Sequence, residues 1–153
     1  MKTKIFRADH KKLLPGVYVS KKALSGNLVI TTFDLQFKQP SVDDPISPSA
    51  LHTLEHLGEL YLRTLSPRKD EMIHFGPMGS HTGFHLIMKG DLRSQDVYEM
   101  VAKMCDFIIM YSGEIPGANE HECSNCLDHD LNGAKLCAIG YSDWLRNDPH
   151  YEY

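Results

Sequence analysis

The stretch LHTLEHLGEL, residues 51–60, combines two kinds of side chain on one segment. At about 100° per residue, the apolar side chains of this segment and the residues after it fall on one arc roughly 120° wide. They are Leu51, Leu54, Leu57, Tyr61 and Leu65. His52, Glu55 and His56 occupy the neighbouring arc. The pattern predicts a helix over 49–65 with a core face and, beside that face, a polar trio at the edge of the core.

The polar trio has the spacing of a metal chelate. Two imidazoles at positions i and i+4 lie one helical turn apart and can bind a single cation. Glu55 lies on the same side, where a carboxylate can orient a ligand or move a proton. Catalytic zinc and iron sites use three protein ligands and leave one position open, so a third ligand must come from elsewhere. The candidate is Cys123, in a Cys-x-x-Cys pair with Cys126, and it would complete a His2Cys set for Zn2+ or Fe2+.

Other interpretations of these residues stay open. The two histidines can be an incidental pair on a helix surface. The order H-x-x-E-H also marks the inverted zinc peptidases, but those chains are much larger than 153 residues. A structural zinc finger needs a second close pair of ligands, and a thioredoxin-like redox motif needs a different βαβ context. Cys105 lies in an apolar helical segment and is expected in the core, and Cys137 is assigned no role.

The length and composition indicate one soluble domain, residues 1–153. With a net charge of -4, the chain lacks the excess of positive charge that is typical of nucleic-acid-binding proteins. No apolar run reaches the roughly 18 residues of a membrane span, and MKTKIFRADH has no apolar signal-peptide core. We therefore expect a cytoplasmic protein that binds neither nucleic acid nor membrane. In that compartment the four cysteines are expected to be reduced.

The remaining periodicities predict an α+β fold. In 27–38, Val29, Thr31, Phe33, Leu35 and Phe37 share one strand face, while Asp34, Gln36 and Lys38 share the other, which can border a site. The other expected strands are at 17–20 and, as a pair joined by GPMGS, within 71–89. Further helices are expected at 94–112 and 128–145, with a proline-rich loop at 39–49. Short links between the strands favour an antiparallel sheet packed with helices in a single domain.

Five segments in a fixed order resemble the S-ribosylhomocysteine lyase family, called LuxS. They are FRADH, TTFDLQFKQP, HTLEHL, GPMGSHTGF and IPGANEHEC, and the resemblance extends from about Phe6 to about Cys137. The resemblance implies a LuxS-like α+β homodimer with two active sites at the subunit interface. It also implies a divalent metal, Fe2+ with Zn2+ or Co2+ possible at the same site, held by His52, His56 and Cys123. Glu55 would be the catalytic base.

The resemblance also implies a reaction. The family opens the ribose of S-ribosylhomocysteine, moves its carbonyl from C1 toward C3 and releases homocysteine by β-elimination. The other product is the precursor of the autoinducer-2 signal used in quorum sensing. Phe6 and His10 match residues that reach the partner subunit's site, and Asp34 lies on the strand that contacts the substrate. The chemistry needs a metal that stabilises each enediolate and two acid–base groups on different sides of the sugar.

The sequence departs from the family at four positions near this site. Ser80 replaces the cysteine that serves as the second acid–base group, and Gln36 replaces a substrate-contacting arginine. His81 replaces the arginine or glutamine usual in the family, and His85 replaces an aromatic residue. Either histidine can supply a proton or have no role in the reaction. Ser80 is the weaker acid–base group, because an alcohol does not ionise as readily as a thiol.

Three hypotheses follow from these departures. In the first, the protein is a working S-ribosylhomocysteine lyase, whose turnover can be slowed by Ser80 and Gln36. Otherwise it is a metal enzyme with an altered substrate, or a metal-binding paralogue without catalysis. In each case the small-molecule pocket would include Asp34, Gln36 and His81.

Overall fold

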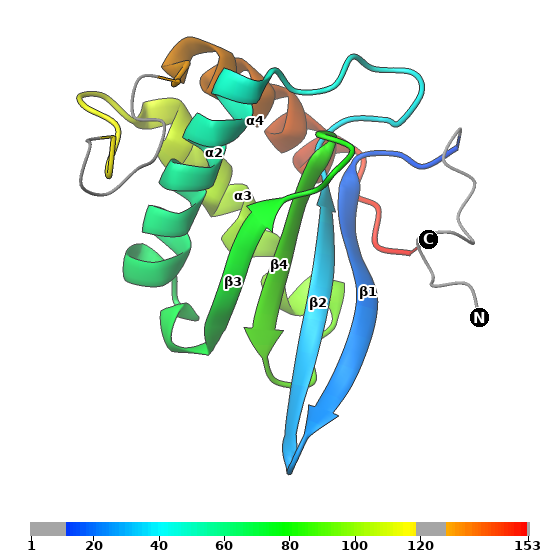
Figure 1. Ribbon diagram of the computed structural model, residues 1–153. Helices are drawn as coiled ribbons and strands as arrows, with labels where there is room; N and C mark the ends of the chain where they lie inside the picture. The colour runs from blue at the N-terminus through cyan, green and yellow to red at the C-terminus, as the bar shows by residue number, and fades with distance from the viewer. Residues whose placement is uncertain (1–11, 119–127, 153) are drawn as a thin grey trace.

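The computed structural model describes residues 12–118 and 128–152 (Figure 1). Within these ranges the strands form one antiparallel sheet in the order β1-β2-β4-β3. The strands are β1 (Gly16–Ser25), β2 (Leu28–Gln36), β3 (Met72–Pro77) and β4 (Gly83–Lys89). The helices are α2 (Pro48–Leu60), α3 (Ser94–Met110) and α4 (Leu131–Asn147). The predicted α+β architecture with an antiparallel sheet is confirmed.

The three helices lie together on one side of the sheet, with α2 beside β3 (Figure 1). Residues that alternate along β2 face these helices, and Thr31, Phe33 and Leu35 are fully buried. Their burial confirms the core face predicted for 27–38. Cys105 of α3 is also fully buried, and burial raises the pKa of its thiol to about 12, as expected for a core cysteine.

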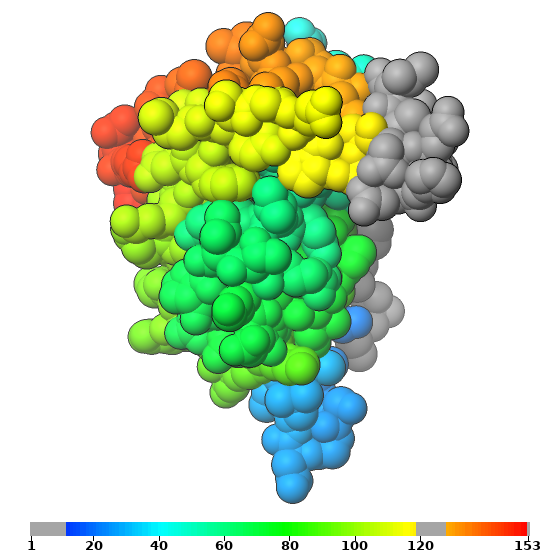
Figure 2. Space-filling view, turned by 90° about the vertical axis from the view of Figure 1, so that its left-hand side faces the viewer, coloured from blue at the N-terminus to red at the C-terminus, as the bar shows by residue number. Residues whose placement is uncertain are grey.

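The β1–β2 hairpin projects beyond the body of the molecule (Figure 2). The expected strand at 17–20 was too short, because pairing with β2 continues through Ser25↔Leu28 after a register shift between Val19 and Lys21. The polar residues of the outer half show no buried face, so alternation did not reveal this part of the strand. The hairpin turns at Gly26, whose φ of 62° suits glycine.

Helix α2 begins and ends with distinct local structures. The Ser47 side chain accepts a hydrogen bond from the Ala50 N–H, and Pro48 occupies the first turn. The helix continues as a π-helical turn, η1 (Tyr61–Leu65), closed by the Ser66 N–H on the Tyr61 carbonyl at 2.9 Å. The wider turn rotates the chain, so the prediction that Leu65 lies in the core is wrong. Leu65 is 59% exposed and Leu62 is fully buried instead.

Strand β3 is held against α2 by one aromatic side chain. Phe75 is buried, stacks on Phe84 with ring centroids 4.7 Å apart, and its ring lies against Gly58 of α2. A Cβ at Gly58 would collide with the Phe75 ring, so glycine permits this close approach. The contact fixes the spacing between the helix that carries His52, Glu55 and His56 and the edge strand that faces it.

Candidate active site

The imidazoles of His52 and His56 meet as the sequence predicts. Their Nε2 atoms are 3.0 Å apart. His52 Nδ1 lies 2.8 Å from the Asp128 carbonyl oxygen, and His56 Nδ1 lies 2.6 Å from that of Pro116. Because a carbonyl oxygen only accepts hydrogen bonds, each Nδ1 carries the proton and donates it. In the neutral rings each Nε2 therefore offers a lone pair.

Two lone pairs at this separation repel each other unless a proton or a cation lies between them. Metal–nitrogen bonds of about 2.0–2.1 Å in a tetrahedral site would set the two nitrogens roughly 3.3 Å apart. The observed 3.0 Å is close to that distance. Backbone carbonyls that bind the outer ring N–H of each histidine are the usual support of metal-ligating imidazoles. This pair therefore fits a divalent metal.

A third imidazole, His129, joins the pair, and sequence analysis missed it. Its ring stacks on His52 with centroids 4.2 Å apart and meets His56 edge-on at 4.8 Å. One potential ligand atom from each of the three residues lies within 4.8 Å of the others. The sequence signal was the segment Asp128–Asp130 at the predicted start of the third helix, but helical spacing does not place that segment beside α2.

Hydrogen bonds fix the tautomer of His129 as well. The Thr53 hydroxyl donates to the Ser49 carbonyl, so its oxygen accepts from the Asp130 N–H at 2.9 Å and from His129 Nδ1 at 3.0 Å. His129 Nε2 is buried and has no hydrogen-bond partner among the described residues. Burial, and then the neighbouring His52 and His56, lower the pKa of His129 and favour its neutral form. The cluster thus holds three ring nitrogens able to bind a cation.

Three of the predicted site residues lie outside the described residues. They are Phe6, His10 and Cys123. Their predicted roles at the partner subunit's site and as the third metal ligand stay predictions.

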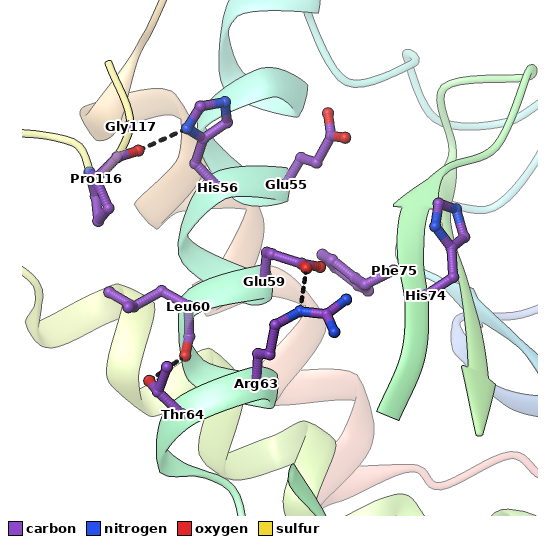
Figure 3. Close-up of a pocket in the computed structure, with 10 residues that line it drawn as sticks. All are labelled: Glu55, His56, Glu59, Leu60, Arg63, Thr64, His74, Phe75, Pro116 and Gly117. Atoms are coloured by element: carbon purple, nitrogen blue, oxygen red, sulfur yellow. Dashed lines mark hydrogen bonds and ion pairs between the residues drawn. The ribbon is translucent and has the colours of Figure 1, made fainter. Parts of the chain in front are cut away.

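Glu55 lines a cavity of about 560 Å³ between α2 and β3 (Figure 3). Helix α2 contributes Glu55 and Glu59, the π-helical turn η1 contributes Arg63, and β3 contributes His74. His56 lines the end of the cavity nearest the histidine cluster. The other lining residues are Leu60, Thr64, Phe75, Pro116 and Gly117. Since His56 belongs to both, the imidazole cluster and the cavity form one continuous site.

Ser80 and Gln36 share a hydrogen-bond network away from this cavity. The Gln36 side chain is 2% exposed and donates to the Lys38 carbonyl and to Thr82 Oγ1. Thr82 Oγ1 is in turn hydrogen-bonded to Ser80 Oγ at 2.8 Å. Among the residues that the structure describes, neither Ser80 nor Gln36 lines the cavity beside Glu55.

The remaining candidates lie on the sheet and in its turn. His85 Nδ1 is 2.7 Å from Asp34 Oδ1, and the Asp34 carboxylate is 1% exposed, so the two cross-strand partners form an Asp–His pair. His81 is exposed in the β3–β4 turn at a φ of 59°, and its carbonyl accepts from the Ile46 N–H. Neither histidine is among the described residues that line the cavity.

Comparisons with known proteins identify the family of this chain. None of the helices in the described part of the chain is long and apolar enough to cross a membrane. The family model described as S-Ribosylhomocysteinase (LuxS) matches residues 3–149. Three relatives are each named S-ribosylhomocysteine lyase. The one from Finegoldia magna is 40% identical over 146 residues, which cover 95% of this chain and 92% of the relative.

The other two relatives are similar over almost the same length. The protein from Borreliella burgdorferi is 40% identical, with 93% of this chain and 90% of the relative covered. The protein from Phocaeicola vulgatus is 44% identical, with 89% and 84% covered. With a family match over nearly the whole chain and relatives of this similarity, the protein belongs to the LuxS family.

Proposed function

We propose that this protein is an S-ribosylhomocysteine lyase that converts S-ribosylhomocysteine to homocysteine and the autoinducer-2 precursor. The observation that carries the proposal is the position of Glu55, whose carboxylate lines a cavity beside the imidazole cluster. Family membership and the names of the relatives support the same reaction. The cavity volume of about 560 Å³ suits a small polar metabolite.

We propose that His52, His56 and Cys123 hold a divalent ion, Fe2+ in the active protein, with Zn2+ or Co2+ able to take its place. The inward-facing Nε2 atoms of the histidines support this assignment, and the buried Nε2 of His129 is available to the same ion. When bound, such an ion acts as a Lewis acid that stabilises negative charge on a sugar oxygen. The Asp128 and Pro116 carbonyls keep the ring protons of His52 and His56 away from the ion.

Glu55 is the proposed base that moves protons between sugar carbons. It lies between His52 and His56 in sequence but projects toward the cavity, while His56 turns toward Pro116 (Figure 3). Its carboxylate has no hydrogen bond or ion pair to any other side chain within the described ranges. A carboxylate without a competing donor is free to accept a proton from a bound substrate.

Substrate binding is proposed to involve both subunits of a homodimer. Phe6 and His10 of one subunit would complete the site of the other, and Asp34, Gln36 and His81 stay candidates for substrate contact. The Gln36 Nε2 group already donates to the Lys38 carbonyl and to Thr82, so donation from this nitrogen to a substrate would require one of these hydrogen bonds to break. The cytoplasmic location also stays a prediction.

The proposal is tested by following homocysteine release with a thiol reagent after loading with Fe2+ or Co2+ without oxygen. Glu55→Ala is the inactive reference, and Glu99→Ala on the exposed side of α3 is the matched control. We expect turnover in the unaltered protein and in Glu99→Ala, and a loss of about 10²–10⁴ in Glu55→Ala. Substrate binding without turnover in the unaltered, metal-loaded protein would contradict the proposal and indicate a non-catalytic paralogue.

A further inference from the structure

We propose that His74 is the second proton-transferring group of this active site and works opposite Glu55. The inference rests on the proposed lyase function and extends it, because the family position of the second group is occupied here by Ser80, an alcohol. His74 lies on β3 and lines the cavity from the side opposite α2 (Figure 3). Imidazole exchanges protons readily near neutral pH, and hydroxyl groups do not.

Some of the ionisable side chains that line the cavity have a hydrogen-bond or ion-pair partner, and others have none among the described residues. Glu59 and Arg63 form an ion pair at 2.5 Å. His56 donates from Nδ1 to the Pro116 carbonyl, and its Nε2 faces His52 as part of the proposed metal site. The side chains of Glu55 and His74 have no hydrogen bond or ion pair to another described residue. Of the ionisable groups that the structure places around the cavity, these two are therefore available for proton transfer.

A β-bulge gives His74 this position. Met72 pairs with Met88, but His74 pairs with Ile87, so the register shifts by one residue between Met72 and His74. Without the shift, Ile73 would pair with Ile87, and His74 would pair with Leu86, which is fully buried on the helix side of the sheet. The bulge instead leaves Ile73 and His74 exposed while Met72 and Phe75 stay buried. Bulges commonly re-aim side chains next to active sites.

Gly76 leaves room for the imidazole. His74 and Gly76 lie two residues apart on β3, and a Cβ at Gly76 would come within 2.6 Å of His74 Nε2. That distance is shorter than any ordinary contact, so a side chain at this position would push the ring aside. The ring therefore lies over the bare backbone of Gly76, with its edge accessible to the cavity.

The other candidates for the second group are placed less favourably. The Ser80 hydroxyl is bonded to Thr82, and the His85 ring is bonded to the buried Asp34 carboxylate. His81 projects from the β3–β4 turn. In the described structure none of these three residues lines the cavity that contains Glu55, whereas His74 does.

The charged groups facing His74 set the conditions for its proton exchange. From α2 and η1 these are Glu55 and the Glu59–Arg63 pair, in which the two charges offset each other. From β4, the neighbour of Gly76 is His85, which is paired with Asp34 of β2. The Pro116–Gly117 segment contributes no ionisable side chain. Among the described residues that line the cavity, Glu55 is therefore the carboxylate without an ion-pair partner.

The proposed step is the first carbonyl shift of the open-chain sugar. The Glu55 carboxylate takes the proton from C2, the C2–H electron pair forms the C1=C2 bond, and the C1 carbonyl oxygen receives a proton from the His74 imidazolium. The resulting enediol then gives its O2 proton to neutral His74 as the C2=O bond forms. Glu55 returns its proton to C1. Both residues end as they began, and the aldehyde has become a ketone without any outside oxidant or reductant.

Kinetics with His74→Gln test the proposal, because glutamine keeps the size and polarity of the ring but cannot exchange a proton. We expect kcat to fall about 10²–10⁴-fold, with substrate affinity nearly unchanged and one limb of the pH–rate profile lost. In His74→Ala, added imidazole should restore part of the activity in proportion to its concentration. Imidazole added to the unaltered protein controls for its binding to the metal, and thermal unfolding of each variant controls for folding.

The outcomes separate this inference from the proposed function. Turnover in the unaltered protein together with near-normal kcat in His74→Gln would overturn the role of His74 and leave the lyase function standing. A comparable loss found only in His81→Gln or His85→Gln would also overturn it. An unaltered, metal-loaded protein that releases no homocysteine would overturn both, because His74 would then have no lyase reaction to serve.

Discussion

The side chains of Gln36 and Ser80 are both hydrogen-bonded to one oxygen atom, Thr82 Oγ1. Thr82 Oγ1 is 2.7 Å from Gln36 Nε2 and 2.8 Å from Ser80 Oγ. Because the three side chains share one atom, a substitution at either position alters the hydrogen bonding of the other. Gln36, Thr82 and Ser80 therefore form one hydrogen-bonded unit.

This coupling predicts non-additive stability effects. Thr82→Val removes the shared oxygen and should lower the free energy of unfolding by about 1–3 kcal/mol, because Thr82 is buried and polar groups around it lose a partner. Gln36→Leu should destabilise by a similar amount, and the double variant by clearly less than the sum. Urea unfolding measures all three. Thr64→Val, at an exposed hydroxyl of η1, is the control and should change stability by no more than about 0.5 kcal/mol. Additive losses would show that the residues are uncoupled.

Cobalt binding should report on the imidazole cluster. We expect His56→Gln to lower Co2+ affinity by more than about 10²-fold, and His129→Gln by about 10- to 100-fold with a changed visible absorption spectrum. His150→Gln, outside the cluster, is the matched control. Titration of the metal-free protein with Co2+ provides affinity and spectrum together. An unchanged spectrum in His129→Gln would mean that His129 does not bind the ion and would leave His52, His56 and Cys123 as the proposed ligands.

Mixed dimers should test the roles predicted for the N-terminal residues. If His10 completes the partner subunit's site, Glu55→Ala and His10→Ala chains are each inactive but complement one another. Half of randomly mixed dimers then contain one intact site, so activity should recover to about a quarter of the unaltered level. Mixing after mild unfolding and refolding, with each variant refolded alone as the control, measures this recovery. Absence of recovery in a mixture shown to exchange subunits would place His10 in its own subunit's site.

Gly58→Ala should disturb the cavity by displacing Phe75, one of the residues that line it. The added methyl group meets the Phe75 ring, so we expect a loss of about 1–3 kcal/mol in the free energy of unfolding. Since Phe75 directly follows His74, turnover should fall as well. Gly140→Ala in α4 is the control, because no atom lies within 4 Å of its added carbon and alanine favours a helix. Equal effects of the two substitutions would contradict the packing argument.

The Asp106–Arg146 pair between α3 and α4 predicts a pH dependence of stability. The hydrogen bonds from Arg146 lower the pKa of Asp106 below its ordinary 3.8. The pair therefore stabilises the fold above that value, and its contribution is lost as the pH falls through the lowered pKa. Arg146→Met should reduce stability at pH 7 by less than about 1 kcal/mol, since the pair is exposed, and should have no such effect near pH 2. Lys89→Met serves as the surface control, and a loss that persists at low pH would assign it to packing.

Periodicity and motif spacing were enough to predict the sheet, the helices and the His52–His56 pair. The sequence did not reveal features that depend on interruptions of that periodicity. The π-helical turn at Tyr61–Leu65 rotates Leu65 out of the core, and the bulge after Met72 turns His74 from the core side to the cavity. Each insertion shifts the face of every later residue, and no residue type marks it.

The His129 position was missed for a different reason. Its approach to α2 depends on the Thr53 hydroxyl, which is bonded to residues of both segments. Such a contact joins parts of the chain 76 residues apart, and helical spacing describes only neighbours along one element. Placement of the third imidazole therefore required the tertiary structure.

The carbonyls that orient the two motif histidines also determine the cost of bringing in a further ligand. Pro116 and Asp128, bonded to His56 and His52, flank the segment that contains Cys123. Both ends of that segment are thus already fastened to the helix that carries the histidines. The conformational entropy of bringing Pro116 and Asp128 to this helix is lost when the chain folds. It is therefore not part of the free-energy cost of binding an ion. If Cys123 is the third ligand, as proposed, the cost of holding the two ends of its segment beside the histidines therefore falls on folding and not on metal binding.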